Sequence, residues 1–223
     1  MDSLPWKLAT WLIPLIIAIV FHEVSHGLVA NALGDPTARQ RGRLSFNPLR
    51  HIDPFGTVLL PMLLAVTGAP VFGWARPVPV VASRLRNPRW HMILVALAGP
   101  GMNLLLALIA AMMIAALVAL APTGIGWAFL GQNLLNFVAI NIFLAVFNLI
   151  PLPPFDGGHV VEGLLPPPLA IQYGKLKRYG FLLLIILLLV IPHLFPGANI
   201  VERVVGPPVN WLLHLLLPSA LLA

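Results

Sequence analysis

Two histidines and a glutamate lie together near the start of the chain, in the stretch His22-Glu23-Val24-Ser25-His26. Residues four apart share a face of a helix, so both imidazoles can bind one metal ion. Glu23 lies beside them on the helix surface, where its carboxylate can act as a general base toward a metal-bound water. The flanking residues are apolar, and ionisable groups within a membrane segment generally mark a functional site.

A second motif brings an acid to the end of another apolar stretch, Asn148-Leu149-Ile150-Pro151-Leu152-Pro153-Pro154-Phe155-Asp156-Gly157-Gly158-His159. Its prolines break the preceding helix, and broken backbone at membrane depth is tolerated only when it lines a cavity or is buried in protein. Catalytic zinc typically has three protein ligands and one water. The chain has no cysteine, so we predict one zinc ion bound by His22, His26 and Asp156.

The composition is that of a membrane protein. Of the 223 residues, 59% are hydrophobic and 9% are charged, whereas about a quarter are charged in soluble domains. The net charge of +6 does not indicate nucleic-acid binding, because the basic residues lie in short loops between apolar stretches. At this length we expect a single membrane-embedded unit over residues 1–223.

The apolar stretches predict an all-α polytopic protein with about five to six transmembrane helices. The predicted spans are residues 6–33, 90–120, 126–150, 176–195 and 207–222. Residues 55–66 are too short to cross, because a span needs roughly 20 apolar residues, so they are predicted to form a re-entrant segment or a tilted hairpin. Residues 42–46 and 78–81 are predicted to form a small membrane-associated β-sheet.

The basic residues orient these spans. Three groups of them follow the first helix, precede the second and precede the fourth, and together they hold eleven of the thirteen lysines and arginines. The positive-inside rule places these groups in the cytoplasm. The N-terminus is then outside the cell membrane, and His26 and Asp156 reach a similar depth near the cytoplasmic side.

These residues resemble a known family. His22-Glu23-x-x-His26, together with Asn148-x-x-Pro151-x-Pro153-x-x-Asp156-Gly157-Gly158, is similar to the paired motifs of the site-2 protease family of intramembrane zinc metalloproteases. Further stretches resemble its small single-domain branch, which lacks PDZ and CBS domains; they are residues 34–38, 42–48, 51–54, 73–79 and 98–103. The resemblance covers about residues 6–162, the expected catalytic core, and leaves residues 176–222 as accessory helices.

The resemblance implies an enzyme that binds zinc through His22, His26 and Asp156 and uses Glu23 in catalysis. It also implies cleavage of transmembrane protein substrates near the cytoplasmic face, in regulated intramembrane proteolysis. A metal-ion or proton transporter is the alternative function for the same cluster. It is disfavoured because residues 11–21, toward the far face, offer no further polar path apart from the irregularity at Pro14.

Two asparagines are secondary candidates for binding the substrate or supporting the transition state. Asn148 precedes Asp156 by two helical turns; it could simply pack between helices, but the resemblance implies that it contacts the substrate backbone or a ligand. Asn103 either donates to a developing oxyanion or packs between helices, and the sequence favours neither. His51 is expected to be a solvated loop residue, and His159 an interfacial residue rather than a fourth ligand, because four ligands would close the site to water.

Overall fold

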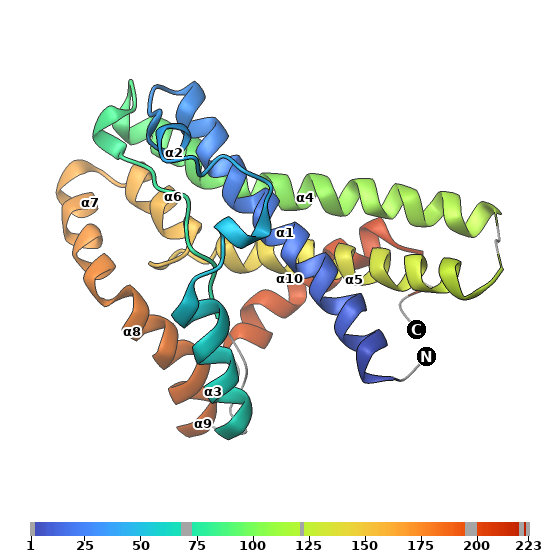
Figure 1. Cartoon of the computed structure of the whole chain (residues 1–223). Coiled ribbons are helices and arrows are strands. Elements are labelled where there is room, and N and C mark those ends of the chain that lie inside the picture. The colour runs from blue at the N-terminus through green and yellow to red at the C-terminus, as the bar shows by residue number, and fades with distance from the viewer. Residues whose placement is uncertain (1–2, 68–72, 121–122, 195–199, 219–220, 222–223) are drawn as a thin grey trace.

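Three long helices form the centre of the molecule (Figure 1). The computed structural model describes residues 3–67, 73–120, 123–194, 200–218 and 221. Within these residues all regular secondary structure is helical. The α-helices are α1 (Leu4–Ala32), α2 (Thr37–Gln40), α3 (Leu60–Thr67), α4 (Pro88–Leu120), α5 (Ile125–Asn148), α6 (Asp156–Leu164), α7 (Pro167–Gly174), α8 (Gly180–Ile185), α9 (Ile191–Leu194) and α10 (Ile200–Leu216). Short 3-10 or π-helices are η1 (Pro48–Arg50), η2 (Pro54–Leu59), η3 (Ala82–Arg84), η4 (Lys175–Tyr179) and η5 (Ile186–Val190).

Among the described residues, three helices are long and apolar enough to cross a membrane: α1 with 29 residues, α4 with 33 and α5 with 24. They confirm the first three predicted helices, with ends that differ from the predicted ones by a few residues. α4 and α5 run alongside each other, and α1 packs across both of them (Figure 1).

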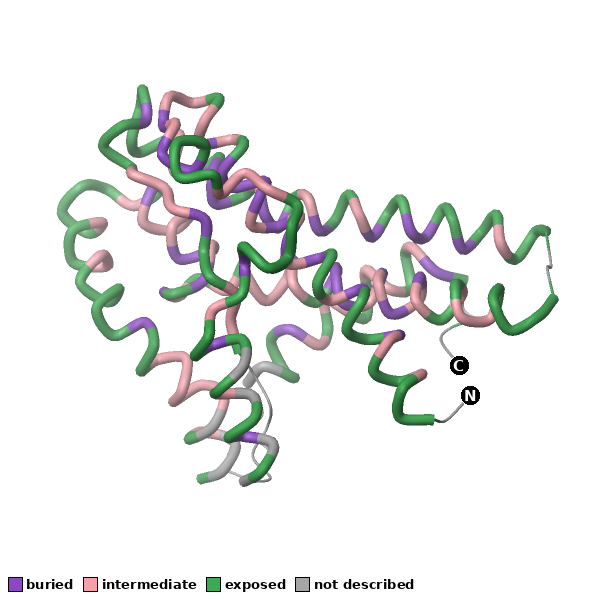
Figure 2. The backbone as a smooth tube through the Cα atoms, in the orientation of Figure 1, coloured by how far each residue is buried: buried purple, intermediate pink, exposed green. Residues whose placement is uncertain are grey.

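Small residues on α4 allow α5 to come close. Ala107, Ala110 and Ala111 of α4 are buried against Leu134 and Val138 of α5. In a membrane the hydrophobic effect does not drive helices together, so close packing between small residues and hydrogen bonds must do so. Exposed and buried residues alternate along the three spans (Figure 2). Many of the exposed ones are large and apolar, as expected for surfaces that contact lipid.

Pro14 in α1 creates one of these hydrogen bonds. Proline has no N–H, so the carbonyl of Thr10, four residues earlier, loses its partner within the helix. Asn136 of α5 replaces that partner, since its Nδ2 donates to Thr10 O at 2.7 Å. The irregularity in α1 is therefore used to bind α1 to α5.

The predicted fourth and fifth spans differ from the structure. The described part of residues 176–195 forms consecutive short helices (η4, α8, η5 and α9), and α10 begins seven residues earlier than predicted and has 17 residues. No single helix in either segment is long enough to count as a membrane span by itself. Of the five to six predicted spans, three are therefore supported among the described residues. Residues 55–66 are helical, in η2 and α3, and too short to span.

The predicted β-sheet is wrong for the described residues, none of which forms a strand. Residues 73–81 are extended, but their N–H groups bind elsewhere. Trp74 N donates to Gly56 O, Arg76 N to His51 O, and Val78 N to the side chain of Glu23. Pro77 and Pro79 have no N–H to donate. No row of donors remains with which this segment could pair with a neighbouring strand.

Candidate metal centre and its pocket

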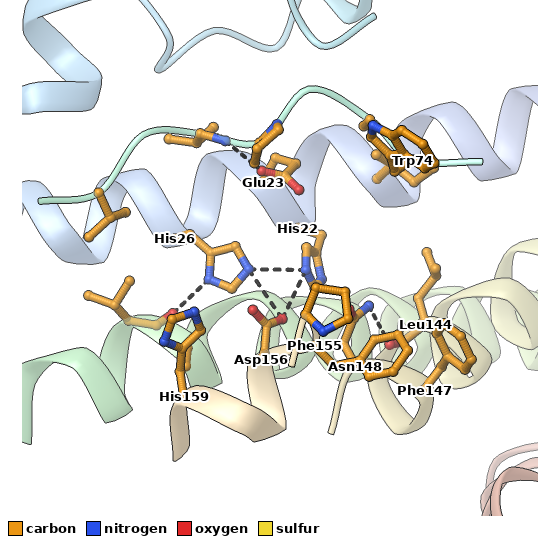
Figure 3. Close-up of a pocket in the computed structure, with 18 of the residues that line it drawn as sticks. His22, Glu23, His26, Trp74, Leu144, Phe147, Asn148, Phe155, Asp156 and His159 are labelled. Carbon is orange, nitrogen blue, oxygen red and sulfur yellow. Dashed lines mark hydrogen bonds and ion pairs between the residues drawn. The ribbon is translucent and has the colours of Figure 1, made fainter. Parts of the chain in front are cut away.

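Three side-chain atoms from two distant parts of the chain converge at one point (Figure 3). His22 Nε2 lies 3.0 Å from His26 Nε2 and 3.2 Å from Asp156 Oδ2, and His26 Nε2 lies 3.4 Å from the same oxygen. Among the described residues these form the one group of three potential metal ligands. The two histidines come from one face of α1, as the sequence predicts.

Asp156 is the first residue of α6, and glycines fix the position of this helix. A Cβ on Gly157 would overlap the carbonyl of Leu149, and one on Gly158 would be 2.9 Å from the carbonyl carbon of Leu152. Both glycines lie inside the helix, and neither has a positive φ. Their role is therefore close packing of α6 against the proline-rich turn, residues 149–155, that precedes it.

The other end of α6 is attached to α4. Arg89 Nε donates to Gly163 O at 2.7 Å, and Arg89 Nη2 donates to Leu165 O at 2.8 Å. These carbonyls lie at the C-terminus of α6, where they have no partner within the helix. Because α6 is held at both ends, Asp156 has little freedom to move relative to α4.

α4 lies directly beneath the two imidazoles. His26 Nδ1 donates to Val95 O at 2.7 Å, and His22 Nδ1 lies 2.6 Å from Asn103 Oδ1. Between these contacts, a Cβ on Gly99 would overlap both rings. The absence of a side chain at residue 99 is what allows α4 to approach so closely.

The geometry of the three atoms fits a tetrahedral zinc site. With metal–ligand bonds of about 2.0–2.1 Å, neighbouring ligand atoms are about 3.3 Å apart. The three observed separations are 3.0, 3.2 and 3.4 Å. Asp156 Oδ2 is also buried without a hydrogen-bond partner, which is costly unless a cation or a donor satisfies it. Two imidazoles and a carboxylate are a usual ligand set for zinc.

Glu23 lines the same cavity but faces a different element. The cavity has a volume of about 620 Å³ and is bordered by α1, by the extended residues 73–81, by the proline-rich turn and by Phe181 of α8. Val78 N donates to Glu23 Oε2 at 2.8 Å. In Figure 3 the carboxylate of Glu23 points toward the 73–81 segment, while the imidazoles point toward Asp156.

The remaining predicted residues lie in different surroundings. Asn148 borders the cavity, with its Nδ2 bonded to Leu144 O one turn earlier in α5. Asn103 is fully buried below the imidazoles rather than in the cavity lining. His51 is buried, not solvated, and its Nε2 donates to Ser45 O at 2.7 Å. His159 borders the cavity without joining the three converging atoms.

Three positioning features went unrecognised in the sequence: Gly99, Val78 and Asn141. Asn141 is fully buried in α5 and accepts a hydrogen bond from Asn103 at 2.8 Å. A polar residue in the middle of an apolar span was the available signal for it. The backbone contact of Val78 had no signal, because any residue type except proline supplies an N–H.

Comparisons with known proteins show which family the chain belongs to. The chain matches the pattern of Peptidase family M50 over residues 10–132 and 129–191. The protein named "Putative zinc metalloprotease YwhC" of Bacillus subtilis (strain 168) is 39% identical over 180 residues, which cover 78% of each chain. Two proteins named "Putative zinc metalloprotease Rip2" are more distant. The one from Mycolicibacterium smegmatis is 31% identical over 184 residues and the one from Mycobacterium tuberculosis (strain H37Rv) is 29% identical over 188 residues.

Both Rip2 matches cover 82% of this chain and 66% of the relative. No solved structure matches the chain. The family match extends over most of the sequence and includes His22 and His26 of α1 and Asp156 of α6, which carry the converging atoms. The chain therefore belongs to Peptidase family M50, the site-2 protease family, and is a zinc metalloprotease of the membrane.

Proposed function

We propose that the protein is an intramembrane zinc endopeptidase that hydrolyses peptide bonds in or near transmembrane segments of membrane proteins. The observation that carries the proposal is the convergence of His22, His26 and Asp156 on one point beside a cavity that also contains Glu23. His22, His26 and Asp156 hold one zinc ion. When bound, zinc lowers the pKa of water toward 7 and polarises the carbonyl of the substrate.

Glu23 is the general base. Its Oε2 accepts the N–H of Val78, so the proton taken from the attacking water goes to Oε1 and is then passed to the leaving amine. The hydrogen bond from Val78 keeps the carboxylate at the border of the cavity, and proton transfer by a positioned carboxylate accounts for about 10²–10⁴-fold in rate. His22 and His26 contribute through Nε2, because their Nδ1 atoms are engaged by α4.

The substrate must enter the cavity as an extended chain, because a helix hides its carbonyl groups in its own hydrogen bonds. Asn148 borders the cavity and is proposed to contact the substrate backbone. Residues 1–223 act as one membrane-embedded domain, with a catalytic core over residues 6–162 and accessory helices over residues 176–222.

We place the active site near the cytoplasmic side of the cell membrane and the N-terminus outside. The distribution of basic residues supports this orientation, since ten of the thirteen lie in segments that follow α1, precede α4 or precede α8, and an eleventh, Arg89, lies in the first turn of α4. Regulated intramembrane proteolysis of a membrane-bound protein is the physiological role that family membership supports.

The test is cleavage of a labelled transmembrane substrate by the purified full chain in detergent or liposomes. Glu23→Gln removes the base and leaves all three zinc ligands in place. We expect turnover to fall about 10²-fold or more, with one zinc per chain retained in elemental analysis. Glu162→Gln is the matched control, because Glu162 pairs with Lys177 outside the converging group. Equal cleavage by Glu23→Gln and wild type would refute the proposal.

A further inference from the structure

We propose that Asn103 and Asn141 form a two-amide relay that fixes the tautomer of His22 and so presents its Nε2 lone pair to the metal. The inference rests on the proposed zinc site. Both asparagines are positioning residues: neither lines the cavity, and both act through His22. The relay joins three helices, since His22 lies in α1, Asn103 in α4 and Asn141 in α5.

The direction of the relay follows from its far end. Asn141 Nδ2 lies 2.8 Å from Phe137 O, and a backbone carbonyl can only accept a hydrogen bond. The amide nitrogen of Asn141 must therefore face that carbonyl, and its Oδ1 must face Asn103. Asn103 Nδ2 donates to this oxygen at 2.8 Å, which leaves Asn103 Oδ1 turned toward His22.

The last link sets the proton on the imidazole. Asn103 Oδ1 lies 2.6 Å from His22 Nδ1. Because an amide oxygen has no proton to give, Nδ1 must carry the hydrogen. In a neutral imidazole the other nitrogen, Nε2, then has a free lone pair. Nε2 is the atom that converges with His26 Nε2 and Asp156 Oδ2.

Burial makes this arrangement hard to replace. Asn103 and Asn141 have 0% exposure, so water cannot substitute for a lost partner. Reversing either amide would place two donors or two acceptors face to face, and an unpaired polar group inside an apolar bundle is costly. A second, longer contact from Asn103 Nδ2 to Ala18 O, at 3.4 Å, favours the same orientation of Asn103.

The two histidines are thus oriented by different means. His26 Nδ1 donates to the backbone carbonyl of Val95, which cannot rotate within α4. The acceptor for His22 is a side-chain amide, which can rotate unless something holds it. Asn141 supplies that restraint, and this explains why a polar residue is buried in the middle of α5.

The experiment measures zinc affinity of the purified full chain by competition with a chelator. Asn103→Leu removes the acceptor, so His22 either shifts its proton to Nε2 or loses its orientation. We expect zinc to bind about 10–100-fold more weakly, as is typical when the partner of a ligand histidine is removed. Asn141→Leu should give an intermediate loss.

Asn136→Leu is the matched control. Asn136 is also a buried asparagine of α5 that bonds to another helix, through Thr10 O, but it has no connection to His22. It should leave zinc affinity unchanged. Imidazole ¹⁵N spectra of the zinc-free protein provide a second measurement: the Nδ1–H form of His22 should persist in Asn136→Leu and be lost in Asn103→Leu, with His22→Ala identifying the signal.

Equal zinc affinity in Asn103→Leu and Asn136→Leu, with unchanged ¹⁵N spectra, would overturn the relay. If Asn103→Leu does not fold, Asn141→Leu carries the same comparison. The proposed function fails in a different way. Wild-type protein that binds no zinc would refute the zinc site and the relay together, whereas tight zinc binding with equal cleavage by Glu23→Gln and wild type would refute the proteolytic mechanism and leave the relay standing.

Discussion

Each imidazole of the candidate centre uses both of its ring nitrogens. The Nε2 atoms converge with Asp156, and the Nδ1 atoms bond to α4 at Val95 and Asn103. A histidine held through its second nitrogen has a fixed ring orientation and is a stronger metal ligand. At the scale of single residues, the site therefore depends on α4 as much as on the motif in α1.

Gly99 tests this dependence. Gly99→Ala puts a methyl group where the two imidazoles lie, so the rings or α4 must move. We expect zinc affinity and turnover both to fall by at least tenfold, because small displacements of ligand atoms are costly at a metal site. Chelator competition and the cleavage assay measure the two effects.

Gly101 gives the matched control on the same helix. A Cβ at Gly101 meets nothing within 4 Å, and alanine is favoured over glycine inside a helix by about 0.5–1 kcal/mol. Gly101→Ala should therefore keep full zinc affinity. If both variants behave like wild type, α4 does not constrain the imidazoles.

Much of the candidate site could be predicted from the sequence. The spacing of His22 and His26 fixes a common helix face, and the prolines before Asp156 indicate a break beside a cavity. The parts that could not be predicted depend on how the helices are aligned. That Asn103 lies under His22, or that Val78 faces Glu23, follows from the relative positions of segments more than 50 residues apart, and local spacing does not contain that information.

At the scale of elements, the extended residues 73–81 are held by two carboxylates of the α1 region. Glu23 Oε2 accepts from Val78 N at 2.8 Å, and Asp35 Oδ2 accepts from Val81 N at 2.6 Å. Asp35 is fully buried and also accepts from the backbone N–H and the hydroxyl of Thr37. Two attachments three residues apart fix how this segment lies along the cavity.

Asp35 makes this attachment sensitive to acid. Burial of Asp35 opposes ionisation, but the hydrogen bonds from Thr37 and Val81 outweigh it and lower its pKa below the usual value. The resulting stabilisation is present above about pH 4, the pKa of an unfolded aspartate, and is lost as the pH falls through the lower pKa of the folded protein. We expect the protection of the Val81 amide, measured relative to its intrinsic exchange rate at each pH, to fall in that acid range.

Asp35→Asn should weaken the attachment of Val81 already at neutral pH. The charge-assisted hydrogen bonds contribute about 1–3 kcal/mol, so the protection of the Val81 amide relative to its intrinsic exchange rate should be lower by about tenfold or more at pH 7 and should change little on acidification. Glu162→Gln, which removes a carboxylate elsewhere, should behave like wild type. Slow exchange at Val81 in Asp35→Asn would show that the carboxylate does not hold the segment.

The fold could be predicted from the sequence where a single property, the length of an apolar run, determines the element. Long apolar runs identified α1, α4 and α5 because membrane thickness sets a minimum length. The predicted sheet at residues 42–46 and 78–81 was wrong because extended backbone was equated with strand pairing, whereas the N–H groups of Val78 and Val81 bind carboxylates. The predicted spans after Asp156 stay predictions, because residues 176–194 are divided among η4, α8, η5 and α9 and because α10 has 17 residues.

At the scale of the whole molecule, the proposed orientation in the membrane predicts which loops are accessible from each side. The chain has no cysteine, so single cysteines can be introduced and labelled without background. Arg41→Cys, in the exposed basic segment after α1, should react with an impermeant maleimide only after the membrane is opened. Thr123→Cys, in the charge-free turn between α4 and α5, should react in intact cells.

Both positions are exposed to solvent, so either cysteine reacts in detergent whatever the orientation, which serves as the internal control. The reverse pattern in intact cells would place the converging residues near the outer face and would contradict the proposed cytoplasmic active site. The same pair of variants would then reassign the side on which the substrate is cut.

Pro14 has a further consequence, for the rotation of α1 about its own axis. Lipid tails are as apolar as the side chains of neighbouring helices, so hydrophobicity gives α1 no preferred angle. Two hydrogen bonds to different neighbouring helices fix this angle. Thr10 O accepts from Asn136 of α5, and His26 Nδ1 donates to Val95 O of α4. Stepping by one residue would turn the helix by about 100° and break both. The proline that leaves Thr10 without a partner thus gives the N-terminal half of α1 its own fixed point, while the bond from His26 to α4 holds the helix at the level of the imidazoles.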